Sequence, residues 1–158
     1  DQSEAMALSD RILVMKLGVV QQIATPLNVY HNQSNRSVFS FIGLSSFTNV
    51  VWKDGRAYIQ GAEQPLPEAL TPTEAMRQEK VFSLASRPSE IEFTSPTDSK
   101  GVKGIVTRKA FLGEIVDYQI KVGDQTLRVQ LGRRDAAHEV DEACYLNFLR
   151  PFWYALDK

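Results

Sequence analysis

Cysteine and histidine are scarce in this sequence: Cys144 is the only cysteine, and His31 and His138 are the only histidines, among 158 residues. A single cysteine excludes an intramolecular disulfide and any structural zinc site built from several thiolates. No apolar stretch reaches the roughly 20 residues that a membrane-spanning helix needs, and the first residues lack the basic start and apolar core of a signal peptide. Basic and acidic residues nearly balance, at 18 and 19, so no overall field favours nucleic acid or anionic lipid. We therefore expect any link to a membrane to be made through a partner protein.

The residues of a nucleotide-hydrolysing site are also missing. Such a site needs a glycine-rich loop ending in Gly-Lys-Ser/Thr, because backbone N–H groups and the lysine hold the phosphates. None of the nine glycines is followed by lysine, and no acidic pair at the end of a strand is placed to hold magnesium. We predict that this chain is not an enzyme and has no catalytic, cofactor-binding or metal-binding residues.

His138 and Cys144 are the residue types of a thiolate dyad, but their contexts favour structural roles. Cys144 alternates with Leu146 and Phe148, as expected for the buried face of a strand, and His138 lies among acidic residues. A buried cysteine behaves as a small apolar residue, so the structural interpretation is favoured.

The first 43 residues indicate short helices around a pair of strands. Residues 3–8 favour a helix capped by Ser3, and the apolar runs 12–15 and 19–24 favour strands joined by a tight turn. Thr25-Pro26 and Asn35 are typical helix starts, and Gly43 is a typical left-handed helix end. In the second of these helices, we expect the inward face to carry Val38, Phe41 and Ile42.

Beyond residue 43 the apolar period changes from helical to alternating. Asp54-Gly55 is a strong hairpin signal, residues 81–86 favour a strand, and residues 116–122 and 127–131 alternate as a half-buried antiparallel hairpin. The alternation around Cys144 favours a last strand that closes a small barrel, followed by an irregular exit at residues 151–153. The predicted fold class is mainly β: a small OB-like antiparallel barrel at residues 44–158, preceded by a short α/β arm at residues 1–43.

Arg87 stands at the end of an apolar strand, followed by Pro88-Ser89-Glu90. The proline fixes φ, so the guanidinium is held close to a turn. Capture of an anion is one use, and pairing with Glu90 or a neighbouring carbonyl is the favoured alternative. The basic run of Lys100, Lys103, Arg108 and Lys109 could follow a phosphate backbone, but no aromatic residues are interleaved with it for base stacking, so nucleic acid is not an expected partner.

The order of motifs in residues 1–43 resembles the end of the ATPase domain of ABC importers of the maltose, polyamine, ferric-iron and sulfate type, from just after the switch histidine. The later residues resemble the same family's OB-like regulatory domain, called TOBE. Arg87-Pro88 with Glu90 is similar to its Arg-Pro-Glu element, and Phe111-Leu112-Gly113-Glu114 to its Leu-Gly turn. This sequence departs from the family pattern at Ala24, Asn28, Ser37 and Ser89.

The resemblance implies which residues carry family motifs: Asp1, Gln2, Arg87, Pro88, Glu90, Leu112, Gly113 and Glu114. It also implies a parent ATPase, using ATP and magnesium, that couples hydrolysis to solute uptake on the cytoplasmic face of a bacterial membrane through transmembrane permease subunits. Because the chain begins after the switch histidine, we expect it to be the non-catalytic regulatory and dimerisation part. A homodimer is expected through the C-terminal domain or through a swapped N-terminal arm. An oxyanion-sensing domain that binds a small anion such as molybdate is the first alternative, and an OB-type nucleic-acid binder is the second.

Overall fold

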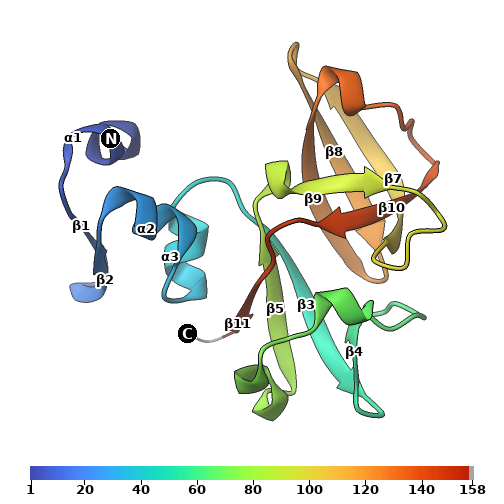
Figure 1. Ribbon diagram of the computed structural model, residues 1–158, viewed down its shortest axis with the longest axis horizontal. Coiled ribbons are helices and arrows are strands. Elements are labelled where there is room, and N and C mark those ends of the chain that lie inside the picture. The colour runs from blue at the N-terminus through green and yellow to red at the C-terminus, as the bar shows by residue number, and fades with distance from the viewer. Residues whose placement is uncertain (157–158) are drawn as a thin grey trace.

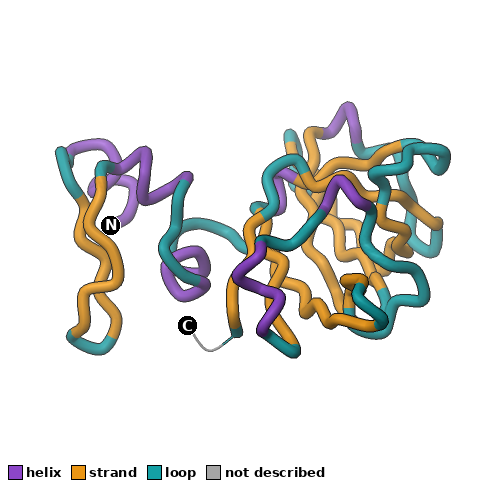
Figure 2. The backbone as a smooth tube through the Cα atoms, turned by 60° about the horizontal axis from the view of Figure 1, so that its bottom comes forward, coloured by secondary structure: helices purple, strands orange, loops and turns teal. Residues whose placement is uncertain are grey.

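The computed structural model describes residues 1–156, in which a small arm lies beside a β-rich body (Figure 1). We use "arm" for residues 1–42 and "body" for residues 46–155. The view in Figure 2 shows the first helix and first hairpin of the arm projecting from the body. None of the helices within residues 1–156 is long and apolar enough to cross a bilayer.

The arm is built from short elements whose starts are set by capping side chains. Its elements are α1 (Gln2–Leu8), β1 (Ile12–Lys16), β2 (Val19–Ala24), α2 (Pro26–His31) and α3 (Arg36–Phe41). Thr25 and Asn35 cap α2 and α3, as predicted. The predicted cap of the first helix is wrong: Asp1, not Ser3, accepts the hydrogen bond from the N–H of Glu4, at 3.0 Å. A carboxylate at the helix start also faces the positive end of the helix dipole.

Four buried side chains, Val14, Val29, Val38 and Ile42, form the centre of the arm's own apolar cluster. The predicted inward face of α3 is therefore right for Val38 and Ile42 but wrong for Phe41, which is 59% exposed. Phe39 is the buried phenylalanine of this helix instead. Gly43 follows with φ 77°, the left-handed conformation expected at a helix end.

The body is built mainly from antiparallel strands. Its strands are β3 (Ser46–Lys53), β4 (Arg56–Ile59), β5 (Val81–Ser86), β6 (Ile91–Thr94), β7 (Val102–Phe111), β8 (Ile115–Val122), β9 (Gln125–Gly132), β10 (Ala143–Phe148) and β11 (Phe152–Ala155). Short 3₁₀ turns are η1 (Glu68–Leu70), η2 (Glu74–Gln78), η3 (Pro88–Glu90) and η4 (Arg133–Asp135). Asp54 and Gly55 turn the β3–β4 hairpin with φ 52° and 77°. The β8–β9 hairpin pairs Val116 with Leu131, so both predicted hairpins are confirmed.

The strands form two main sheets, ordered β6-β10-β7-β8-β9 and β11-β5-β3-β4, and the β1–β2 hairpin of the arm is a third. The predicted mainly-β class with antiparallel sheets is confirmed. Within residues 1–156, however, no backbone ladder joins β6 to β9, so the five-stranded sheet is not one continuous closed barrel. The predicted irregular exit is wrong at residues 152 and 153, because Phe152–Ala155 is the strand β11 and pairs with β5.

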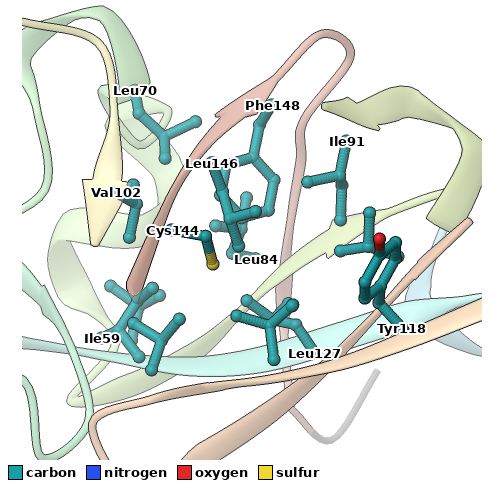
Figure 3. Packing of buried hydrophobic residues seen from close by; sticks show 14 of the residues in the cluster. Ile59, Leu70, Leu84, Ile91, Val102, Tyr118, Leu127, Cys144, Leu146 and Phe148 are labelled. Atoms are coloured by element: carbon teal, nitrogen blue, oxygen red, sulfur yellow. The ribbon is translucent and has the colours of Figure 1, made fainter. Parts of the chain in front are cut away.

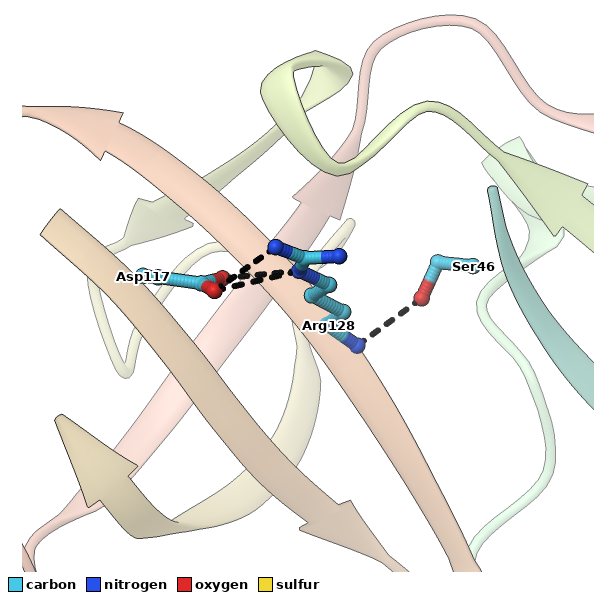
Figure 4. A network of polar contacts seen from close by, with 3 residues as sticks. All are labelled: Ser46, Asp117 and Arg128. Carbon is cyan, nitrogen blue, oxygen red and sulfur yellow. Dashed lines mark hydrogen bonds and ion pairs between the residues drawn. The ribbon is translucent and has the colours of Figure 1, made fainter. Parts of the chain in front are cut away.

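Side chains tie β9 of the five-stranded sheet to β3 of the four-stranded sheet. The backbone N–H of Arg128 in β9 donates to Ser46 Oγ in β3 at 2.9 Å (Figure 4). The N–H of Asn49 in β3 donates to the side chain of Gln125 in β9 at 3.2 Å. Arg128 also binds the Asp117 carboxylate on β8 through Nε and Nη2. Polar side chains thereby satisfy backbone groups that sheet pairing leaves open.

Both sheets contribute to one apolar core, which holds the body together (Figure 3). Leu84 and Ile59 come from the four-stranded sheet, and Tyr118, Leu127 and Leu146 from the five-stranded sheet. The predicted buried face of the last alternating strand is confirmed, since Cys144, Leu146 and Phe148 are all buried. The body therefore carries most of the apolar burial in the chain.

Candidate functional site

The surface where α3 meets the four-stranded sheet is the candidate site, and Phe39 is at its centre. The Phe39 ring is fully buried. Its centroid lies 5.6 Å from that of Phe47 on β3, 5.4 Å from Phe152 and 5.8 Å from Tyr154 on β11. These are ordinary distances for tilted and edge-to-face aromatic pairs. An aromatic side chain of the arm is thus enclosed by an aromatic pocket of the body, and we call this contact the Phe39 joint.

Arg87 completes the Phe39 joint from the end of β5. Its Nη1 donates to the carbonyl oxygens of Phe39 at 3.0 Å and Leu44 at 2.9 Å, and to Ser45 Oγ at 3.0 Å. Its Cζ lies 3.8 Å from the centroid of the Phe39 ring and 5.4 Å from that of Tyr30. The structure therefore shows the carbonyl alternative for Arg87. One guanidinium holds the end of α3, the connecting segment and two aromatic rings of the arm.

The charge of Arg87 is almost completely removed from water, since the residue is 3% exposed. Burial lowers the pKa of Arg87 from its usual value, while nearby Tyr30, Tyr154 and Glu90 favour the charged form. Within residues 1–156, Nε and Nη2 have no hydrogen-bond partner. The aromatic faces partly replace them, because a desolvated cation over a ring gains about 2 kcal/mol. Removal of this side chain would take the charged donor from the Phe39 and Leu44 carbonyls and leave Ser45 Oγ as the remaining donor to Phe39.

Two further hydrogen bonds connect to the same end of the arm. The hydroxyl of Tyr154 on β11 donates to the Gln33 carbonyl at 3.0 Å, and burial raises the pKa of Tyr154 to about 12. Gln2 of α1 donates from Nε2 to the Phe41 carbonyl at 2.8 Å. The last strand of the body and the first helix of the arm therefore both bind the segment around α3.

The predicted motif residues fall into two separate places. Arg87, Pro88 and Glu90 stand at η3, and the Glu90 carbonyl accepts from the N–H of Leu149. Gln2 lies at the same helix end that Arg87 holds, and Asp1 caps α1. Leu112, Gly113 and Glu114 instead form the turn between β7 and β8, apart from this site. Their assignment as motif residues stays a prediction.

Other residues that the sequence singles out have structural partners. The Cys144 thiol contacts the backbone of Gly104, and burial raises its pKa to about 11, whereas His138 stacks on Phe93 at 4.0 Å between ring centroids. Lys109 of the basic run pairs with Glu139 at 2.8 Å. Among residues 1–156, no three histidine, cysteine or acidic side chains gather in a way that could hold a metal ion.

Sequence reasoning missed the aromatic residues of the Phe39 joint. Phe47, Phe152 and Tyr154 face Phe39, yet residues 152 and 153 were expected in an irregular segment. The alternation of Phe152 and Tyr154 is the signal that could have indicated a strand with one aromatic face.

Comparison with known proteins gives the family. The TOBE domain family matches residues 84–151. The spermidine/putrescine import ATP-binding protein of Pseudomonas fluorescens is 32% identical over 80% of this chain, which corresponds to 34% of that relative. The sn-glycerol-3-phosphate import ATP-binding protein of Paracoccus denitrificans is 32% identical over 96% of this chain and 43% of its own length. The sulfate/thiosulfate import ATP-binding protein of Rhizobium meliloti is 28% identical over 89% of this chain and 36% of its own.

The chain spans between 34% and 43% of the length of these three relatives, and the matching part is their C-terminal region. The match to the Paracoccus denitrificans relative covers 96% of this chain, so it includes residues of both the arm and the body. This chain therefore belongs to the family of ABC-importer ATP-binding subunits, whose C-terminal region it matches, and residues 84–151 are its TOBE domain.

Proposed function

We propose that this chain is the regulatory and dimerisation part of the ATP-binding subunit of a bacterial ABC importer. The similarity to three import ATP-binding proteins with different named solutes supports the proposal. In the proposed parent, ATP hydrolysis drives solute uptake, and the subunit sits on the cytoplasmic face of the membrane against transmembrane permease subunits. The hydrolysis itself would belong to residues outside this chain, because the phosphate-binding loop that it requires is not in the sequence.

The Phe39 joint is the observation that carries the regulatory part of the proposal. The arm resembles the end of an ATPase domain, and Arg87 of the body binds its carbonyls at Phe39 and Leu44. A packed aromatic contact and a buried cation resist bending, because interiors are close-packed and transmit strain. A displacement of the ATPase domain would therefore be passed to the TOBE domain, and the reverse holds for a partner that binds the TOBE domain.

The importer assignment is tested with the whole subunit, isolated from membranes with its partners. We expect an affinity-tagged subunit to co-purify in constant ratio with a multispanning membrane protein, and the complex to hydrolyse ATP in lipid nanodiscs. Recovery of the subunit without a membrane partner, or a complex without ATP hydrolysis, would overturn the assignment. The purified 158-residue chain should show no ATP turnover above a buffer control, and turnover there would contradict its non-catalytic role.

The role of the joint is tested in the same complex by Arg87→Met, with Arg128→Met as a matched control. Both changes remove a guanidinium from the body, but Arg128 binds Asp117 and Ser46, which both belong to the body. We expect ATP hydrolysis coupled to uptake to fall several-fold with Arg87→Met and to change little with Arg128→Met. Equal effects of the two variants would remove the joint from the mechanism. Thermal unfolding of each complex separates lost coupling from lost folding.

A further inference from the structure

The turn between β7 and β8 carries apolar side chains into solvent at the end of the body. Phe111 is 66% exposed and Leu112 is 61% exposed, and Ile115 beside them is 45% exposed. Leu149, at 55%, lines the same hollow as Ile115. We call these four residues the turn patch. Large apolar side chains gathered in this way are typical of surfaces that bind another protein.

The fold holds the turn patch in a defined shape. The N–H of Leu112 donates to the Ile115 carbonyl at 2.9 Å, which closes the turn, and Gly113 takes φ 93°. The N–H of Arg133 donates to the Glu114 carbonyl at 2.9 Å and ties η4 to the turn. Figure 1 shows this turn and η4 at the same end of the five-stranded sheet. The exposed side chains are therefore presented by paired backbone.

A hollow lies next to these protruding side chains, between the unpaired edges of β6 and β9. It has a volume of about 500 Å³, and Phe93, Leu131, Ile115 and Leu149 are among the residues that line it. The turn patch thus has a knob, formed by Phe111 and Leu112, beside a hole. In a two-fold symmetric contact each patch meets itself in the opposite direction, so the knob of one copy faces the hole of the other.

The charges around the turn patch favour a second copy over a strongly charged partner. Glu92 and Asp135 line the hollow, and Arg133 and Arg134 are exposed on η4 next to it. A patch that must bind itself needs both signs, because like charges that face each other are repelled. A basic or an acidic partner would instead fit a surface of one sign.

We propose that the turn patch is the surface through which two copies of this chain pair, with Phe111 and Leu112 of each copy entering the hollow between β6 and β9 of the other. The proposal rests on the proposed function, in which the subunit works as a pair, and it names the surface for that pairing. It places the dimer contact on the body and away from the Phe39 joint, so pairing does not cover the joint.

The arm offers the competing surface. Leu13, Met15 and Ile23 of the β1–β2 hairpin are 49%, 54% and 48% exposed and lie on its outer face. Pairing through this hairpin face would join two arms instead of two bodies. Both surfaces expose large apolar side chains to a similar extent. Substitution to Asp in each surface therefore gives a matched comparison.

The test is the solution mass of the purified chain, measured by light scattering and sedimentation across a range of concentrations. We expect the unaltered chain to approach twice 17.8 kDa. Leu112→Asp and Phe111→Asp should each weaken the dimer at least about tenfold, because a charge would enter an apolar contact. Met15→Asp should leave the dimer unchanged. Circular dichroism should show all three variants folded, since the altered side chains are more than half exposed.

Each contrary result has a distinct meaning. A monomer at every concentration, or a dimer that neither turn-patch variant weakens, overturns the proposal. Weakening by Met15→Asp alone, or equally by the arm and turn-patch variants, assigns the contact to the hairpin face or to both surfaces and also overturns it. The membrane co-purification and ATP hydrolysis of the whole subunit do not depend on these variants, so the importer assignment can stand when the turn patch fails.

Discussion

The arm and the body are stabilised in different ways. The arm's own cluster centres on four buried side chains, whereas the body buries apolar residues from both of its sheets in one core. The arm also leaves Leu13, Met15 and Ile23 about half exposed. Burial of apolar area is the main source of stability, so the body should fold on its own contacts, while the arm depends on the Phe39 joint.

The substitution Phe39→Ala gives the strongest test of whether the arm depends on the Phe39 joint while the body does not. The change empties the aromatic pocket formed by Phe47, Phe152 and Tyr154, and loss of a fully buried phenylalanine costs about 3–5 kcal/mol. We expect amide hydrogen exchange to accelerate across residues 12–42 while β7–β10 stay protected. Phe41→Ala, in the same helix but largely exposed, should change exchange little. Uniform acceleration through the body would show that arm and body unfold as one unit.

The buried Cys144 thiol makes the stability of the body core depend on pH, and this dependence can be measured. Burial raises its pKa to about 11, so the folded chain keeps the proton at pH values where the unfolded chain loses it. The contribution of this thiol to the free energy of unfolding is therefore fully present below the ordinary thiol pKa. It falls as pH rises from about 9 toward 11, and about 2 kcal/mol is lost at pH 10.5. Denaturant unfolding at pH 8 and pH 10.5 measures this loss.

The control for the alkaline prediction is Cys144→Ala. The variant has a cavity cost at both pH values but should lose less stability between them, because it has no thiol to ionise. Tyr154, with its pKa raised to about 12, adds a smaller loss that begins near the ordinary tyrosine pKa of about 10 and continues toward 12. This loss is common to both proteins. An identical fall with pH in the two proteins would remove Cys144 as its cause.

The features that could be predicted from the sequence are those decided by neighbouring residues. Asp54-Gly55 specifies its turn through the positive φ that both residues adopt, and Thr25 and Asn35 cap helices through side chains that reach only three residues ahead. The alternation in β8 and β9 similarly fixes which face is buried. Such signals are complete within a short segment of chain.

The Phe39 joint could not be predicted because its partners are distant in sequence. Val38, Phe39 and Phe41 of α3 and its C-cap residue Ile42 are all apolar, so a helix of six residues gives no clear inward face. Phe39 is buried because Phe152 and Tyr154 of the last strand cover it. The Arg87 contacts form only because α3 packs against the four-stranded sheet. From the sequence alone, Arg87 could bind an anion, Glu90 or a neighbouring carbonyl.

The smallest expected effect concerns the charged pair of Arg128 and Asp117 on the body. Their side chains are 41% and 21% exposed, and the guanidinium binds the carboxylate through two nitrogens. Hydrogen bonding to Asp117 raises the pKa of Arg128, but water and salt screen such a pair, so Asp117→Asn should cost no more than about 1 kcal/mol. Denaturant unfolding at low and high salt measures this cost, with Glu74→Gln in the more exposed Arg77 pair as the control. A cost comparable to that of Phe39→Ala would contradict the view that apolar burial, and not surface charge, distinguishes the body from the arm.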